Sequence, residues 1–258
     1  KKLQSSSFQN GVYFVEYLES AWYQVLEIES IIKIMPQWDD YSYLNWWKGL
    51  SCLMKLSWFT EKDFIATTYN SITSANFEWS APSNIALVKY WGKIENQLDE
   101  EGEILTQIPA NPSVSFTLNS CKTVTKLAFA KKSNDGNFSF DLLFEGKPKE
   151  EFKPKILKFL ERVEVYLPFL KDYHFTIDTQ NTFPHSSGIA SSASGMAALA
   201  VNFMSIEKLL SRNFGTEMTD EYFNKKASFL ARLGSGSACR SIKGNIVVWG
   251  NHKNIEGS

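Results

Sequence analysis

Three short segments of the sequence carry side chains whose types and spacing suit the binding of anions. The first, residues 81–93, reads Ala-Pro-Ser-Asn-Ile-Ala-Leu-Val-Lys-Tyr-Trp-Gly-Lys. Lys89 interrupts an apolar strand-like run, and a desolvated ammonium is unfavourable unless it meets an anion. Lys93 follows Gly92, which frees the backbone, and Tyr90 adds a hydroxyl donor. Read alone, the segment favours the alternative of a strand end with solvated lysines.

The second segment, residues 184–195, is a loop of small residues in front of a predicted helix and reads Pro-His-Ser-Ser-Gly-Ile-Ala-Ser-Ser-Ala-Ser-Gly. Free N–H groups at a helix start and the positive end of its dipole favour an anion, and Gly188 permits close backbone approach. Ser191 and Ser192 add hydroxyl donors. It is not a Walker A loop, because no Gly-Lys-Ser/Thr follows. Read alone, it fits a phosphate loop and a serine-rich helix cap equally well.

The third segment, residues 234–241, reads Gly-Ser-Gly-Ser-Ala-Cys-Arg-Ser. It offers backbone donors, hydroxyls and the Arg240 guanidinium, which can bind a carboxylate or phosphate through two hydrogen bonds. These donors suit a second, separate anion. Read alone, the segment favours a flexible glycine-serine turn beside a surface arginine.

Hydrophobic periodicity predicts the elements that must position these segments. Alternation over residues 77–91, 113–118, 124–130 and 138–144 indicates an antiparallel set of strands. The pattern predicts a helix over 151–167, stopped by Pro168, and a strand over 174–179 that contains Asp178, to which we assign a structural role. Helices over 192–210 and 221–233 and a strand over 245–249 follow. This order indicates an α+β fold rather than a Rossmann sheet.

Composition bounds the class of protein. The 258 residues carry a formal net charge of -1, which gives no overall field for nucleic acid or an anionic membrane. Three cysteines without metal-ligand spacing indicate reduced thiols, each interpreted as a small buried residue, in a cytoplasmic protein. No apolar run of about eighteen residues and no signal peptide is evident.

Residues 1–75 differ from the rest of the chain in tryptophan content and in hydrophobic periodicity. They hold Trp22, Trp38, Trp46, Trp47 and Trp58, yet show no sustained period and suggest no function. A small extra domain and upstream sequence translated in frame are both open. We therefore divide the chain into an N-terminal extension, 1–75, and an ATP- and substrate-binding domain, 76–258.

The three segments, in this order, resemble the GHMP kinase superfamily. Within it, Lys89-Tyr90-Trp91-Gly92-Lys93 together with Ser235-Gly236-Ser237-Ala238-Cys239-Arg240 resembles the diphosphomevalonate decarboxylase family. The likeness runs from about residue 78 to 258 and includes Phe183-Pro184. It implies a GHMP kinase-type N-terminal domain with a left-handed β-α-β crossover, without the C-terminal domain. It also implies ATP- and magnesium-dependent phosphorylation of the C3 hydroxyl of mevalonate 5-diphosphate, then loss of phosphate and carbon dioxide to give isopentenyl diphosphate.

The resemblance assigns roles residue by residue. Arg240 would hold the substrate carboxylate and Lys89 the C3 oxygen, and these are the two catalytic assignments. The substrate pocket would be lined by Asn84, Tyr90, Trp91, Gly92, Lys93, Lys155, Ser235, Gly236, Ser237, Ala238, Cys239 and Arg240. The ATP phosphates would be held by Pro184, Ser186, Ser187, Gly188, Ala190, Ser191, Ser192 and Ala193. Lys153 is an alternative to Lys155, and no residue is assigned to magnesium or adenine.

The chain departs from the family in one respect. The family's catalytic aspartate lies in a C-terminal half that these 258 residues do not contain, so we expect a fragment that binds nucleotide and turns over slowly or not at all. Expected partners are ATP and mevalonate 5-diphosphate, with no nucleic acid or membrane, and a homodimer is open because the family often dimerises. The alternatives are a mevalonate 3-kinase, a phosphomevalonate decarboxylase, or a non-catalytic nucleotide-binding module.

Overall fold

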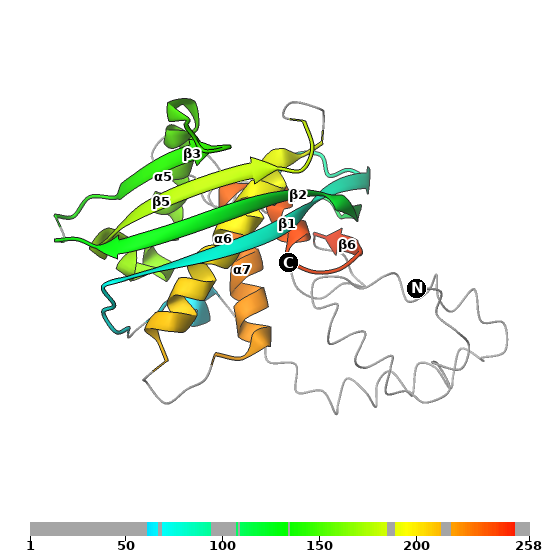
Figure 1. The fold of residues 1–258 in the computed structure, drawn as a ribbon. Helices are drawn as coiled ribbons and strands as arrows, with labels where there is room; N and C mark the ends of the chain where they lie inside the picture. The colour runs from blue at the N-terminus through cyan, green and yellow to red at the C-terminus, as the bar shows by residue number, and fades with distance from the viewer. Residues whose placement is uncertain are drawn as a thin grey trace, which may run out of the picture.

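A six-stranded mixed sheet with helices behind it forms the domain in the computed structural model (Figure 1). The structure describes residues 61–66, 69–93, 107, 109–133, 135–184, 189–212 and 218–250. The predictions for residues 1–60 therefore lie outside the described residues. In the part of the chain that is described, no helix is long and apolar enough to cross a membrane.

The long strand β2, Ser113–Lys131, organises the sheet. The antiparallel strand β1, Ser74–Val88, runs along one side of it. Two strands share its other side: β6, Ile246–Trp249, pairs with the first four residues of β2, and β5, Tyr173–Asn181, pairs with its second half. Two strands were predicted over 113–130, and the structure has this single strand instead.

The strands β3, Ser139–Phe144, and β4, Lys147–Pro148, complete the sheet beyond β5. β3 is parallel to β5, with α5 in the connection between them, so the predicted strand over 138–144 joins the sheet through a parallel neighbour and not through the antiparallel set. Parallel neighbours require such a crossover connection, and this one is the β-α-β unit that the family resemblance implies.

Three helices lie behind the sheet: α5, Lys153–Val163, α6, Ser191–Leu210, and α7, Asp220–Gly234. Of these, α6 packs against β1 and β2, α7 packs on α6, and α5 packs on α7. The predicted helix over 151–167 is shorter in the structure and continues as 3-10 turns at Glu164–Tyr166 and Pro168–Asp172. Further 3-10 turns are Glu61–Phe64, Glu150–Phe152 and Gly236–Ser241, the last of which is η5.

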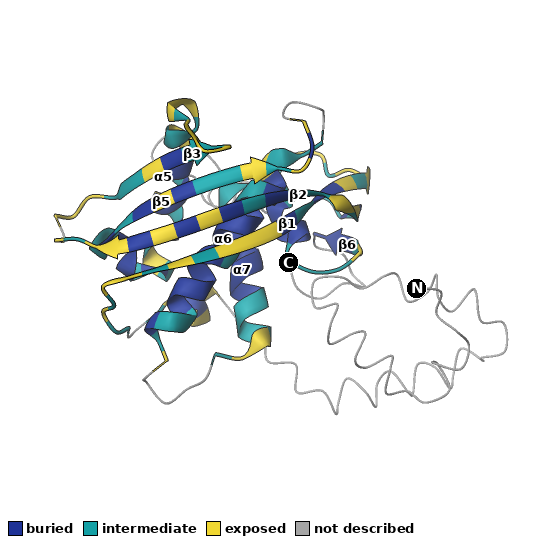
Figure 2. Ribbon diagram, viewed as in Figure 1, coloured by how far each residue is buried: buried dark blue, intermediate teal, exposed yellow. Residues whose placement is uncertain are grey.

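The strand and helix patterns explain this packing. Burial alternates along β2 (Figure 2), so that Thr125, Leu127 and Phe129 are buried and the residues between them are exposed. The small side chains of α6, such as Ala193 and Ala197, are fully buried and allow close approach to the sheet. Close packing of this kind leaves little room for added atoms.

A glycine pair tests how tightly the helices meet. A Cβ at Gly234, at the end of α7, would lie 2.8 Å from Met196 Sδ and 2.9 Å from Phe159 Cδ2. Gly234→Ala should lower the free energy of unfolding by about 1–3 kcal/mol through overpacking. At Gly195 in α6 the nearest atom would be 4.0 Å away, so Gly195→Ala should stabilise the helix by about 0.5–1 kcal/mol. Urea unfolding measures both, and equal effects would contradict this packing.

Candidate functional site

The segment after β1 does not continue the strand. β1 ends at Val88, and Lys89 is exposed, so the prediction that an apolar strand desolvates Lys89 is wrong. The side chain of Asn111 holds this segment instead: its Nδ2 donates to Lys89 O at 3.2 Å and its Oδ1 accepts from Trp91 N at 2.7 Å. Trp91 is 79% exposed, so the described residues do not enclose it in a pocket.

The turn at Gly92 brings Lys93 back to the domain. Gly92 has a φ of 77°, where glycine is favoured, as predicted for a residue that frees the backbone. Lys93 forms a bridge with Pro109, and its Nζ donates to Gln107 Oε1. Gln107 is buried, and a Cβ at Gly236 would lie 3.5 Å from Gln107 O. Gln107 therefore links the first and third segments.

The third segment is ordered by close contacts. It forms η5, so the alternative of a flexible glycine-serine turn is wrong. A Cβ at Gly236 would lie 3.1 Å from Trp249 Cη2, so a larger residue would force the ring to shift. Asn84 of β1 donates from Nδ2 to Ser237 O at 3.2 Å and to Ser241 Oγ at 2.8 Å. The prediction that Asn84 supports this geometry is consistent with these bonds.

Arg240 is the charged group at the centre of this arrangement. It is only 4% exposed, so the alternative of a surface arginine is wrong. Its Nη1 donates to Ser113 Oγ, and its guanidinium lies over the ring of Trp249, 5.6 Å from the ring centroid. No carboxylate of the described residues pairs with it, and its buried Nε has no partner among them. Because an unpaired buried charge is costly, the arrangement suits an anionic ligand.

The start of α6 provides a second set of donors. Residues 185–188, which include the predicted Ser186, Ser187 and Gly188, lie outside the described residues. Ala190 is the N-cap and makes no side-chain cap bond, the first turn has no acidic residue, and Ser192 is exposed. The N–H groups of Ser191 and Ala193 already donate to Ile189 O and Ala190 O, so the exposed Ser192 hydroxyl and the dipole of this 20-residue helix are the features that favour an anion here.

Two neighbouring residues of β1 connect the two sets of donors. Ser83 Oγ donates to Ala190 O at 3.3 Å, whereas Asn84 bonds to η5. Both are buried, and they pair with Leu118 and Thr117 of β2 in regular register. These two adjacent residues of β1 therefore link the start of α6 to η5.

The remaining predicted residues are less closely connected. Lys155 lies exposed in the first turn of α5, a helix that packs on α7, and no described contact joins it to the three segments. Its alternative, Lys153, pairs with Glu150 at 2.9 Å. Asp178 Oδ1 accepts from Gly146 N at 3.1 Å, which agrees with a structural role.

Four residues of the site were not predicted: Gln107, Asn111, Ser113 and Trp249. Ser113 and Trp249 are register partners on β2 and β6, and Tyr90 packs edge-on against Trp249 with centroids 4.9 Å apart. Nothing in the sequence indicates this pairing, because it arises from contacts between distant segments. Asn111 carried a local signal, since asparagine before proline favours a turn.

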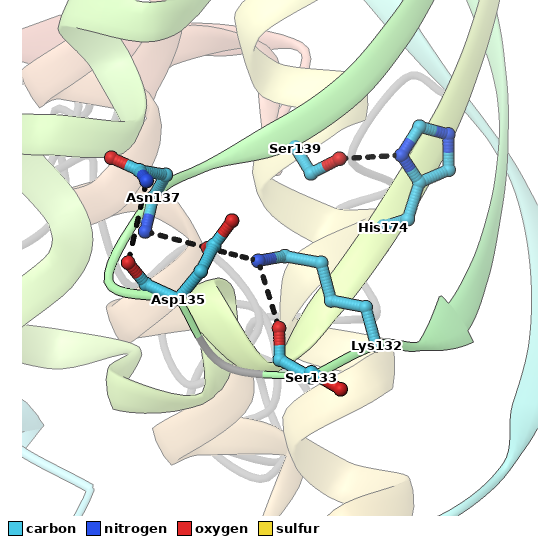
Figure 3. Close-up of polar contacts among 6 residues, drawn as sticks. All are labelled: Lys132, Ser133, Asp135, Asn137, Ser139 and His174. Atoms are coloured by element: carbon cyan, nitrogen blue, oxygen red, sulfur yellow. Dashed lines mark hydrogen bonds and ion pairs between the residues drawn. The ribbon is translucent and has the colours of Figure 1, made fainter.

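A further polar cluster lies at the other end of β2 (Figure 3). Lys132 Nζ bonds to Asp135 Oδ1 at 2.6 Å, and this bond is the main cause that lowers the pKa of Asp135 to about 2. Ser139 Oγ lies 2.7 Å from His174 Nδ1. These groups share no described contact with Arg240 or the start of α6, so we leave them out of the site. Among the described residues, no cluster of three or more His, Cys, Asp or Glu side chains could hold a metal ion.

The sequence and the fold both match known proteins. Residues 81–258 match the family model described as diphosphomevalonate decarboxylase-like N-terminal domain. A diphosphomevalonate decarboxylase from Ganoderma lucidum is 35% identical over 185 residues, which are 66% of this chain and 40% of the relative. The chain thus spans less than half the length of this curated relative.

Solved structures agree with the sequence matches. A mevalonate diphosphate decarboxylase from Staphylococcus aureus has a TM-score of 0.50 and 32% identity, over 70% of this chain and 48% of that one. A structure described as MDDEF in complex with MVAPP, AMPPCP and magnesium has a TM-score of 0.50 and 33% identity, again over 70% and 48% of the two chains.

The two described cysteines should differ in reactivity. Burial raises the pKa of the Cys239 thiol to about 12, and its Sγ donates to Gly236 O at 3.2 Å. Because the thiolate is the nucleophile, Cys239 should resist iodoacetamide at pH 8 in the folded protein. Cys121 is half-buried, contrary to the prediction of full burial, and should react first; Cys52 lies outside the described residues. Mass spectrometry of the alkylated peptides measures this, and rapid modification of Cys239 would contradict an ordered η5.

Proposed function

The chain belongs to the diphosphomevalonate decarboxylase-like N-terminal domain family, and from this premise we propose that it binds the substrates of an ATP-dependent diphosphomevalonate decarboxylase. It spans 40% of the Ganoderma lucidum relative, so the activity proposed is that of the complete enzyme. The substrates are mevalonate 5-diphosphate and ATP, used with magnesium. The product is isopentenyl diphosphate, a precursor in isoprenoid biosynthesis.

The observation that carries the proposal is the buried Arg240 guanidinium without a carboxylate partner among the described residues. A carboxylate of mevalonate 5-diphosphate supplies the missing charge and accepts hydrogen bonds from the guanidinium. Holding this carboxylate until its bond to the rest of the substrate breaks orients the group that leaves as carbon dioxide. Arg240 is therefore assigned to the carboxylate.

The diphosphate is assigned to the donors that flank Arg240. Lys93, Tyr90 and the backbone of Ser235–Ser237 lie on the two segments that meet at Gln107 and Trp249. Lys89 is exposed beyond β1, where its ammonium is available to a ligand, and we assign it to the C3 oxygen. That oxygen first accepts the phosphoryl group and then leaves with it as phosphate, while the electrons of the broken carbon–carboxylate bond form the new double bond.

The ATP phosphates are assigned to the start of α6. The exposed Ser192 hydroxyl can donate to phosphate oxygens, and the helix dipole adds a favourable field. Magnesium, when bound, neutralises phosphate charge during transfer. The described residues contain no metal-binding cluster, and we assign no protein ligand to magnesium.

Ligand preference tests the proposed function. Isothermal titration of the chain with mevalonate 5-diphosphate, mevalonate 5-phosphate and mevalonate should show the tightest binding for the diphosphate, because two segments offer donors to it. Preference for mevalonate or its monophosphate would favour a mevalonate 3-kinase or a phosphomevalonate decarboxylase. Binding of ATP alone would leave a nucleotide-binding module, and binding of none of these compounds would refute the assignment.

The nucleotide assignment has its own test. Ser192→Ala removes a hydroxyl donor and should weaken binding of a non-hydrolysable ATP analogue by about 0.5–1.5 kcal/mol. Binding of mevalonate 5-diphosphate should stay unchanged. Ser139→Ala is the matched control, since Ser139 lies in the polar cluster at the other end of β2. If Ser192→Ala changes only the affinity for mevalonate 5-diphosphate, the assignment of α6 to ATP fails.

A further inference from the structure

Arg240 contacts two residues, Ser113 and Trp249, that are paired on neighbouring strands. Ser113 opens β2, and its register partner on β6 is Trp249. Ser113 Oγ donates to Val88 O at 2.8 Å, so its single hydrogen is engaged and its lone pairs remain to accept from Arg240 Nη1. The hydroxyl therefore has one fixed orientation with respect to the guanidinium.

Trp249 supplies the second side. The Arg240 guanidinium lies over its ring at 5.6 Å, within the distance of a cation–π interaction. Trp249 is 6% exposed, and desolvated pairs of this kind are the stronger ones. Its indole Nε1 is buried without a hydrogen-bond partner among the described residues, so the ring face is the part of Trp249 that carries the contact.

The same ring also connects the two substrate-binding segments. Tyr90 packs on it at 83° between the ring planes, and Gly236 leaves the room that its Cη2 needs. A shift of Trp249 would thus move Tyr90 and η5, which carries Arg240, together. Ser113 bonds to Arg240 directly.

We propose that Ser113 and Trp249 form a positioning pair that fixes the orientation in which the Arg240 guanidinium meets a carboxylate ligand. The inference rests on the proposed function for the identity of that ligand. The positioning itself is a property of the free protein and has its own readout. Neither residue is a catalytic residue, because each acts through Arg240.

Arginine Nε–Hε resonances report the position of the guanidinium without any substrate. The sequence contains four arginines, Arg162, Arg212, Arg232 and Arg240, so Arg240→Lys assigns the signal by its loss. The ring current of Trp249 should displace the Arg240 signal in the parent. Trp249→Leu should remove that displacement, and Trp249→Phe, which keeps an aromatic face, should retain part of it. Trp79→Phe is the control, since Trp79 Nε1 bonds to Ser205 Oγ in another part of the domain.

Ligand affinity is the second readout. Trp249→Leu should weaken mevalonate 5-diphosphate binding roughly 10-fold, in the range expected for a desolvated cation–π contact, and Ser113→Ala by a similar factor. Trp249→Phe should recover most of the loss, and affinity for the ATP analogue should stay within about twofold. In the Arg240→Lys background, Trp249→Leu should add little, because coupled residues are not additive.

The outcomes separate the two proposals. If the parent binds neither the diphosphate nor ATP, the proposed function fails, and the arginine signals still decide whether the pair positions Arg240. An Arg240 signal that is unchanged in both Trp249→Leu and Ser113→Ala overturns the inference. It is also overturned if Trp249→Leu keeps its full effect on affinity in the Arg240→Lys background, or if Trp249→Phe weakens both ligands equally.

Discussion

A buried guanidinium needs an anion or a set of neutral contacts that offset its lost hydration, and this requirement organises one end of the domain. Arg240 has Ser113 and Trp249 around it but no carboxylate among the described residues. Burial is also the main cause that lowers the pKa of Arg240, although a guanidinium remains charged near neutral pH. The free protein therefore holds a buried positive charge that an anion can complement.

Two adjacent residues of β1 connect the surroundings of this charge to the start of α6. Ser83 and Asn84 are both buried, and each bonds to a different element. One bond reaches the N-cap of α6 and the other reaches η5. The relative position of the two proposed anion sites thus depends in part on these two hydrogen bonds from one strand.

The sequence predicted the elements better than their arrangement. Period-two alternation identified β1, β5 and the two ends of β2, and the small residues of α6 identified a closely packed helix, because these patterns are local. The parallel pairing of β3 with β5 was missed, since strand direction depends on the crossover through α5. Lys89 was placed in an apolar strand for a similar reason: its neighbours are apolar in sequence, yet β1 ends one residue earlier, where Asn111 holds the backbone.

The residues of the site divide in the same way, into those that the sequence predicted and those that only the structure reveals. Segment composition and the family resemblance identified Arg240, Asn84, Lys93 and Gly236, whereas Ser113, Trp249 and Gln107 become evident only when β2 and β6 are paired. The two residues assigned catalytic roles, Arg240 and Lys89, also differ in how they are held. Arg240 is rigidly held, whereas Lys89 is exposed at the end of a strand. A fixed guanidinium suits a carboxylate whose position must be defined, and a flexible ammonium suits an oxygen whose charge changes as a phosphoryl group arrives and leaves.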